Sequence, residues 1–526
     1  MKWKVAPKKS NDLLKQLLIN RGIKTKVEIE KFFNPKISDY QKDINIPNIE
    51  KAQKRIFQAI SDNELIIVYG DYDVDGICAS AILYKALTSI GAKVLPYIPH
   101  REKEGYGLSK IGLDFAKDCG AGVVITVDNG IVAIEQAKYA KEIGLDLIIT
   151  DHHLPMDKKP VVYTIVHSTK MCGAAVAWYM TRGIIKKELE HELLQFVSLA
   201  TVCDLLPLVG LGRAYVVEGL KVLNRTTNVG LLALINESGL LLGNVGSYEI
   251  GHILGPRLNA MGRLEHAMDS LRLLCTKDPQ KAKRLARLLA DTNTTRQQMT
   301  TDAIEQAKLL INHNKKIHIL TSHKWSPGII GLIAGRITDE FYRPTIAISL
   351  GETVSKGSAR SLDGINIVEM IRKHADILVD VGGHPRAAGF SIATKNITLF
   401  KKRLEEIMIT LPDKVEQVLE IEAELNLKDL TKTLIEQLEK FEPFGLANPR
   451  PIFATYNMEI SDIRTVGDGK HLKFKVDNID AIAFGMGEMQ NILQNGQQID
   501  LAYTIDIDDY NGFEKLQLKV KDIKIT

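Results

Sequence analysis

Residues 65–76 read LIIVYGDYDVDG, an apolar run that passes directly into a segment with two glycines and three aspartates. Similar short apolar runs follow in the next part of the chain, at residues 94–99, 122–127, 145–150 and 161–166. Segments with helical periodicity, such as 77–90 and 131–143, separate several of these runs. Apolar strands that alternate with helices predict a parallel sheet that is covered by helices on both faces.

The rest of the chain divides by composition. Two segments with apolar residues at helical spacing, 11–20 and 48–60, predict helices near the start. A charged run with almost no glycine predicts a long helix that connects two domains, and a second α/β region follows it. The last region is rich in short strands and turns, which predicts a small barrel. We therefore expect five parts, with boundaries at 1–60, 61–277, 278–314, 315–440 and 441–526.

The overall composition is typical of a globular protein that folds inside the cell. The 526 residues carry a net charge of +4, which neither requires nor excludes a nucleic-acid partner. The five cysteines form no C-x-x-C pair, which argues against a disulfide framework and against a zinc site. No apolar run approaches the roughly 18 residues of a membrane span, and the first residues lack the apolar core of a signal peptide. We expect a cytoplasmic protein without a membrane segment.

Ionisable residues gather where the apolar runs end. They are Asp71, Asp73 and Asp75 after the first strand, Asp128 after the third, Asp151, His152 and His153 after the fourth, and Asp204 after a later apolar run. In an open parallel sheet, ligands bind at the carboxyl ends of the strands. Three of these groups have an ordinary explanation when taken alone, because residues 71–76 could form a turn or a calcium-type loop, Asp128 could belong to a turn, and Asp204 could cap a helix. The triplet at 151–153 is rarer, because three ionisable residues at a strand end need partners. Together they favour a binding site at one edge of the sheet.

The chemistry of these side chains indicates a divalent metal. Crowded carboxylates repel each other and are costly to desolvate, and a divalent cation removes both penalties. Oxygen ligands with one or two imidazoles suit Mn²⁺ or Mg²⁺. Five or more ligands are enough for two ions that share a bridging carboxylate, an arrangement that can catalyse phosphoryl displacement.

The order of these motifs resembles that of the DHH phosphoesterase superfamily, which is named for the triplet at residues 151–153. More specifically, the chain resembles the RecJ family of bacterial exonucleases, which degrade single-stranded DNA in the 5′→3′ direction. The further segments that carry this resemblance are 99–109, 255–264, 325–336, 357–361, 382–391 and 442–451. The resemblance implies an α/β fold with a parallel-sheet DHH domain, a long helix, a second α/β domain (DHHA1) and a β-barrel of the OB-fold type.

The resemblance also implies roles for the residues at the sheet edge. The implied metal ligands are Asp73, Asp75, Asp128, His152 and Asp204, and Asp128 would bridge two ions. Asp151 would orient a neighbouring ligand and His153 would contact the scissile phosphate, so that these two are the expected catalytic residues. One departure concerns Tyr69, because related pyrophosphatases have a histidine at this position. This difference weakens the expected first metal site.

Eight further residues are expected to contact DNA. They are Arg101, Tyr106, Arg257, Asn259, Arg263, Ser358, Arg360 and His384. The first two follow the second strand, the next three lie in a segment whose Gly and Pro residues argue against a plain helix, and the last three lie beside glycines that allow close approach to a phosphate. Each arginine could instead form a surface ion pair, and each glycine segment could be an ordinary turn.

These observations favour a metal-dependent exonuclease that releases 5′-mononucleotides from single-stranded DNA and acts in DNA repair and recombination. The resemblance implies a single-stranded-DNA-binding protein and a helicase as partners. One alternative is a DHH phosphodiesterase that acts on short oligonucleotides or cyclic dinucleotides. Another is a DNA-binding scaffold of the same fold that has no catalytic activity.

Overall fold

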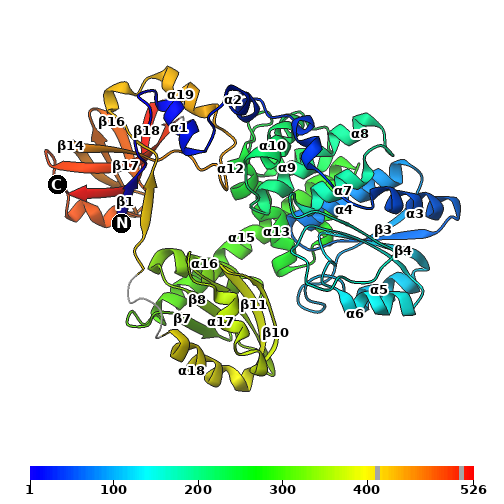
Figure 1. The fold of residues 1–526 in the computed structure, drawn as a ribbon. Helices are drawn as coiled ribbons and strands as arrows, with labels where there is room; N and C mark the ends of the chain where they lie inside the picture. The colour runs from blue at the N-terminus through cyan, green and yellow to red at the C-terminus, as the bar shows by residue number, and fades with distance from the viewer. Residues whose placement is uncertain (409–414, 509–514, 526) are drawn as a thin grey trace. The chain divides into compact units, whose positions relative to one another are not determined.

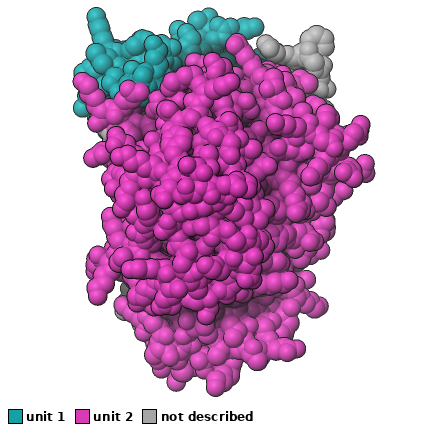
Figure 2. All heavy atoms as spheres, turned by 90° about the vertical axis from the view of Figure 1, so that its right-hand side faces the viewer, with its two compact units in different colours: residues 1–39, 207–214, 416–526 teal, residues 40–206, 215–415 magenta. Residues whose placement is uncertain are grey.

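The computed structural model describes residues 1–408, 415–508 and 515–525. The chain forms two compact units, which Figure 2 shows in teal and magenta. Unit 1 combines residues 1–39, 207–214 and 416–526, and unit 2 combines residues 40–206 and 215–415. None of the helices in the described ranges combines the length and the apolar composition that a membrane crossing requires.

Unit 2 begins with the predicted parallel sheet. Its strand order is β3-β2-β4-β5-β6, with bounds of Lys93–Tyr97, Leu65–Tyr69, Ala121–Val127, Asp146–Asp151 and Thr164–His167. Helices α3 (Ile49–Ser61), α4 (Val74–Ser89) and α7 (Gly173–Thr181) pack on one face, and α5 (Lys110–Asp118) and α6 (Ile134–Glu142) pack on the other (Figure 1). Both faces are therefore buried, which explains why the strands are apolar throughout.

A helical region follows this sheet in unit 2. Its elements are α8 (Lys187–Glu192), α9 (Leu194–Cys203), α10 (Gly210–Leu223), α11 (Val229–Glu237), α12 (Ser247–Glu249), the π-helical turn η2 (Ile250–Leu254), α13 (Gly255–Leu264), α14 (Met268–Cys275) and the long helix α15 (Pro279–Leu309). The first residues of α10, up to Ala214, belong to unit 1.

The expectation that residues 255–264 avoid a plain helix is wrong, because they form α13. Pro256 directly follows the π-helical turn η2, whose wider hydrogen-bond spacing accommodates the missing N–H within the continuous helical run from residue 247 to residue 264. Gly262 allows a close approach instead of a chain break, since a Cβ atom there would lie 2.4 Å from the carbonyl oxygen of Tyr72.

The second α/β region of unit 2 has a mixed sheet. The strand order is β10-β11-β9-β8-β7, with bounds of Leu378–His384, Ala387–Ala393, Val354–Arg360, Thr345–Ser349 and His318–Ser322. Helix α16 (Ile330–Phe341) packs with α15 on one side. Helices α17 (Ile367–Arg372) and α18 (Ile397–Met408) contribute to a second apolar core. The expected second α/β domain is thus confirmed, with Ser358, Arg360 and His384 on strands and not in turns.

Unit 1 contains the expected barrel. The sheet order is β13-β14-β15-β16-β18-β17, and an additional pairing of β14 with β17 nearly closes it. The bounds are Ala423–Glu424, Phe453–Val466, His471–Val476, Ile479–Ala483, Lys515–Ile525 and Gln498–Asp508. Helices α1 (Leu13–Asn20), α2 (Lys26–Phe33) and α19 (Lys432–Glu439) supply residues to its core. The first strand, β1 (Lys2–Val5), pairs in parallel with β12 (Val418–Ile421), so residues 1–39 belong with the barrel, while residues 40–60 belong with the first sheet.

Candidate metal centre

The loop between β2 and α4 brings three aspartates to the edge of the parallel sheet. Asp73 is the N-cap of α4, and its carboxylate accepts the N–H of Gly76 at 3.0 Å. Asp71, two residues earlier in the same loop, is buried. Gly76 is required here, because a Cβ atom at this position would lie 2.6 Å from the backbone nitrogen of Asp71. The glycine-containing sequence therefore folds the loop tightly over Asp71 and places Asp75 in the first turn of α4.

The remaining acidic and imidazole side chains reach the same place from other elements. Asp128 follows β4 with a left-handed backbone (φ 63°), which is uncommon for a residue with a side chain. His152 follows β5, which ends at Asp151. Asp204 arrives from a helix and not from a strand, as the C-cap of α9. Strand ends and one helix end thus converge at one edge of the sheet.

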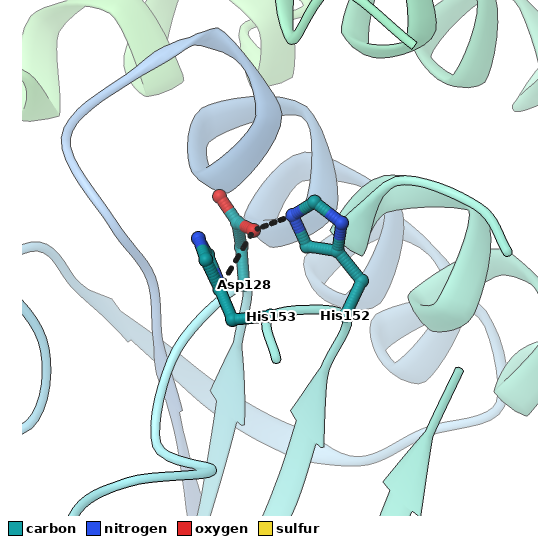
Figure 3. A group of neighbouring side chains, drawn as sticks. All are labelled: Asp128, His152 and His153. Atoms are coloured by element: carbon teal, nitrogen blue, oxygen red, sulfur yellow. Dashed lines mark ion pairs between the residues drawn. The ribbon is translucent and has the colours of Figure 1, made fainter. Parts of the chain in front are cut away.

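These side chains form three groups whose potential ligand atoms lie within 4.8 Å of one another. The groups are Asp71, Asp73 and Asp128; Asp75, His152 and Asp204; and Asp128, His152 and His153. The third group is drawn in Figure 3, where the side chains of both histidines approach the Asp128 carboxylate. The His152 Nε2 atom lies 3.0 Å from Asp128 Oδ1 and 3.5 Å from Asp75 Oδ2. We call the five aspartates Asp71, Asp73, Asp75, Asp128 and Asp204 the carboxylate cluster.

Burial makes the carboxylate cluster electrostatically unfavourable without a cation. Burial, and then the neighbouring carboxylates, raise the pKa of Asp128 and of Asp71 well above the usual range. The same causes raise the pKa of Asp204 to about 8. The Oδ1 atom of Asp71 is buried and has no hydrogen-bond partner among the described residues. Carboxylate oxygens and one imidazole in this state fit Mn²⁺ or Mg²⁺.

Asp151 and His153 form a pair beside this cluster. The Asp151 carboxylate accepts the N–H groups of Ile131, His152 and His153, and it lies 2.7 Å from His153 Nδ1. Burial opposes ionisation of both groups, but their mutual hydrogen bond outweighs it. The pKa of Asp151 is therefore lowered and that of His153 is raised to about 9. The Tyr106 hydroxyl lies 3.1 Å from His153 Nε2 and 3.3 Å from Nδ1, so it contacts the imidazole near both ring nitrogens.

Four arginines of unit 2 form a second cluster, which we call the arginine cluster: Arg101, Arg263, Arg296 and Arg360. Burial, and then the charges of the other three, lower the pKa of Arg263 to about 10. None of the four forms an ion pair with a carboxylate among the residues that the structure describes. Arg360 Nη1 donates to Ser358 Oγ at 3.2 Å, and both lie beside Gly331 at the start of α16. His384 is near enough that the Arg360 charge helps burial to lower its pKa.

Two of the expected DNA-contacting residues lie apart from the arginine cluster. The Asn259 side chain accepts the N–H of Val74 at 3.1 Å, so it holds the loop of the carboxylate cluster. Arg257 donates from Nη1 to the Ile253 carbonyl in its own helix, and its Nε atom is buried without a partner among the described residues.

Asp71 and Arg296 were not assigned to a site from the sequence. Tyr69 was singled out at the metal site, although its hydroxyl bonds with a different loop. Asp71 was seen in the motif but was not assigned as a ligand. Arg296 was hidden in the charged pattern of α15, where no sequence feature separates it from its neighbours. The Tyr69 ring is buried and its hydroxyl bonds with Ser109 and Gly107, so it supports that loop. The first group of potential ligands consists of Asp71, Asp73 and Asp128 and does not include Tyr69.

Comparisons with known proteins agree with this architecture. The DHH family N-terminal domain matches residues 65–201, the DHHA1 domain matches residues 314–410 and the RecJ OB domain matches residues 421–522. The chain is 34% identical to the single-stranded-DNA-specific exonuclease RecJ of Bacillus subtilis (strain 168), over 98% of this chain and 68% of that protein. The crystal structure of RecJ from Thermus thermophilus in complex with Mn²⁺ matches with a TM-score of 0.87 and 26% identity, over 100% of this chain and 80% of that one. The Mg²⁺ complex from the same organism matches with a TM-score of 0.80 and 25% identity, over 100% and 78% of the two chains.

Proposed function

This chain belongs to the RecJ family of single-stranded-DNA-specific exonucleases, and from that membership we propose an enzyme that degrades single strands in the 5′→3′ direction with two divalent cations. The observation that carries this proposal is the pairing of two like-charged clusters in unit 2. One is a crowded set of carboxylates, and the other is a crowded set of arginines without carboxylate partners among the described residues. A metal and a terminal phosphate are the ligands of opposite charge that would satisfy them.

We assign the metal ligands from two of the three groups and leave out the group that includes His153. Asp71, Asp73 and Asp128 would hold one ion, and Asp75, His152 and Asp204 the other, with Asp128 close enough to His152 to serve both. When bound, Mn²⁺ or Mg²⁺ supplies Lewis-acid stabilisation of the phosphoryl group and activates the attacking water. The Asp75 carboxylate also accepts the N–H groups of Gly173 and Ala174 at 2.6 and 2.7 Å, which fixes its orientation.

His153 is suited to contact the scissile phosphate. Asp151 holds its Nδ1 atom, and the raised pKa favours the imidazolium form at neutral pH. The Nε2 side, next to the Tyr106 hydroxyl, is then available to donate to a phosphate oxygen. No side-chain nucleophile is required, because the attacking group is water.

The arginine cluster supports recognition of the 5′ end. Arg101 follows the second strand of the first sheet, and its guanidinium lies 5.0 Å from the centre of the Tyr72 ring, in the loop of the carboxylate cluster. Ser358 and Arg360 approach from the second α/β region. A 5′-phosphate held by these groups would lie next to the scissile phosphate, so that each cycle would release one 5′-mononucleotide. The strength of charge-assisted hydrogen bonds makes this contact selective for a phosphorylated end.

Activity on matched substrates tests this function. A linear single strand should be degraded with Mn²⁺ or Mg²⁺, and a chelator should abolish the reaction. A circular single strand of the same sequence should remain intact, because it offers no end. Cleavage of the circle would indicate an endonuclease, turnover of a cyclic dinucleotide alone would indicate a small-molecule phosphodiesterase, and binding without cleavage would indicate a scaffold.

Family membership also supports the broader parts of the proposal. We infer a role in DNA repair and recombination in the cytoplasm, with a single-stranded-DNA-binding protein and a helicase as partners. The domain boundaries that we propose are 61–277 for the DHH domain, 278–314 for the connecting helix, 315–440 for the DHHA1 domain and 441–526 for the OB-fold. Residues 1–39 would be assigned to the last of these, since α1 and α2 supply residues to the core of the barrel. Co-purification of each partner with the parent protein, and with variants that carry substitutions in unit 1, would test the partner assignment.

A further inference from the structure

A stacked pair of exposed rings lies on α12 and η2. These two elements continue into α13, whose Asn259 side chain bonds with the loop of the carboxylate cluster. The rings of Tyr248 and His252 have centroids 4.4 Å apart and planes 17° apart, the one parallel-stacked ring pair among the described residues. Tyr248 is 63% exposed, and His252 is exposed as well. Two rings stacked in parallel leave an outer face open, and that face can accept a third flat ring.

The backbone under these rings is held firmly. It turns as the π-helix η2, and π-helical turns frequently accompany functional sites. Ile250 and Leu254 are fully buried, and His252 Nδ1 lies 3.2 Å from the Tyr248 carbonyl oxygen. On the inner side, a Cβ atom at Gly255 would lie 2.5 Å from the sulfur of Cys203, the residue before Asp204. The ring pair therefore has a fixed position relative to the carboxylate cluster.

The helix axis gives an approximate distance from the rings to that cluster. Asn259, which holds the backbone of Val74, lies seven residues after His252. At about 1.5 Å per residue, this separation is about 10 Å along the helix. A single strand that ran along this helix with its bases stacked at about 3.4 Å, the spacing within one strand of a duplex, would cover this separation with about three nucleotides.

The surroundings of the ring pair favour a nucleic-acid base as the third ring. Aromatic side chains on which bases stack are a common means by which proteins hold single strands. Leu241 and Leu242 are also exposed in the preceding loop and enlarge the apolar area.

We propose that the Tyr248–His252 pair is a stacking platform for a base about three nucleotides from the scissile phosphate. This inference rests on the proposed function, because it assumes a single strand whose end lies at the carboxylate cluster. Every base has a π-face, so the platform would bind without sequence preference. It would also make the enzyme favour strands that are long enough to reach it over dinucleotides.

Strands that carry 2-aminopurine at one of the first eight positions from a 5′-phosphate test the proposal, because stacking quenches the fluorescence of this base. Binding is measured with a chelator present, so that no cleavage occurs. We expect the strongest quenching near the third or fourth nucleotide. The variant Tyr248→Ala should lose it and should bind a 12-mer about ten-fold more weakly, within the range found for single stacked bases. Tyr248→Phe should keep the quenching, whereas Tyr248→Leu should lose it although the site stays apolar.

Two controls separate this proposal from the proposed function. Phe57 is an exposed aromatic residue of α3 (47% exposed), and Phe57→Ala should change neither quenching nor affinity. Hydrolysis of a dinucleotide with Mn²⁺ should be unchanged in Tyr248→Ala. Parental quenching and affinity in Tyr248→Ala would overturn the stacking platform, as would an equal loss of dinucleotide hydrolysis. A parent protein that cleaves no linear strand would overturn the proposed function instead.

Discussion

The carboxylate cluster and the arginine cluster of unit 2 are both crowded with like charges, but they relieve the crowding differently. Burial and mutual repulsion raise the pKa of Asp204 to about 8, so this carboxyl can become neutral by binding a proton. The same effects lower the pKa of Arg263 only to about 10, so the guanidinium stays charged at neutral pH. The acidic site can therefore hold either protons or a metal, whereas the basic site can be neutralised only by an anion. This difference supports the proposal that unit 2 binds a cation at one cluster and a phosphate at the other.

The largest effect should come from removing the carboxylate that two groups of ligands share. Asp128→Ala should reduce Mn²⁺-dependent activity by more than the about 10- to 100-fold that loss of an outer ligand contact costs. The fold should survive, because the substitution removes a buried carboxylate whose ionisation is opposed by its neighbours. Activity and thermal unfolding are measured together. Near-normal turnover would contradict the assignment of Asp128 to both groups.

The second-largest effect concerns metal binding, in which Asp71 and Tyr69 should differ. Asp71→Asn should weaken Mn²⁺ binding and reduce activity about 10- to 100-fold, since it removes a charged ligand from the first group. Tyr69→Phe should leave metal affinity unchanged, because that hydroxyl bonds with the loop around Ser109. Calorimetric titration with Mn²⁺ measures both variants. The reverse ranking would show that the position of the missing histidine still belongs to the metal site.

These two residues also show how far sequence reasoning extends. The strands, the parallel sheet and the gathering of Asp71, Asp73, Asp75 and Asp128 at its edge were predictable, since local apolar runs set the strands. The assignment of Asp73, Asp75 and Asp128 as ligands came from the family resemblance and stays a prediction. The place of Asp71 among the potential ligands was not predictable, because only the fold over Gly76 buries it among the others. The pairing of β1 with β12 joins residues about 400 positions apart, and no local pattern encodes such a contact.

The arginine cluster illustrates the same limit. Arg296 lies in a helix whose residues are mostly charged or polar, so its approach to Arg263 depends on tertiary packing. Residues 255–264 were wrongly predicted to avoid a plain helix, because Gly and Pro were interpreted as chain breakers. Pro256 instead follows the π-helical turn η2, and Gly262 allows a close contact.

A smaller effect should distinguish Arg296 from an exposed arginine of the same helix. Arg296→Ala should weaken binding of single strands of any sequence and lower the salt dependence by about one unit, as for a phosphate contact. Arg287→Ala is the matched control, because Arg287 is exposed and pairs with Asp291. Affinities over a range of salt concentrations give both slopes. Equal slopes for the two variants would remove Arg296 from the binding site.

The smallest effect concerns pH and the metal-free protein. In the unfolded chain the Asp204 carboxyl has a pKa of about 3.9, well below its value of about 8 in the fold. The folded state therefore binds this proton more tightly, so the stabilisation is complete below about pH 4 and is lost as the pH rises through about 8. The Tm of the chelated protein should fall as the pH rises from about 4 to about 8, and Mn²⁺ should reduce that fall. A fall of the same size in Asp204→Asn would assign it to other groups.

The preference for a phosphorylated end tests most directly whether the two clusters act together. Initial rates are compared on the same linear strand with a 5′-phosphate and with a 5′-hydroxyl, for the parent protein and for Arg101→Ala. The parent should degrade the phosphorylated strand faster, because the arginine cluster binds the 5′-phosphate while the scissile phosphate lies at the carboxylate cluster. In Arg101→Ala this ratio should shrink more than the rate on the hydroxyl strand. Equal rates of the parent protein on both ends would contradict the account.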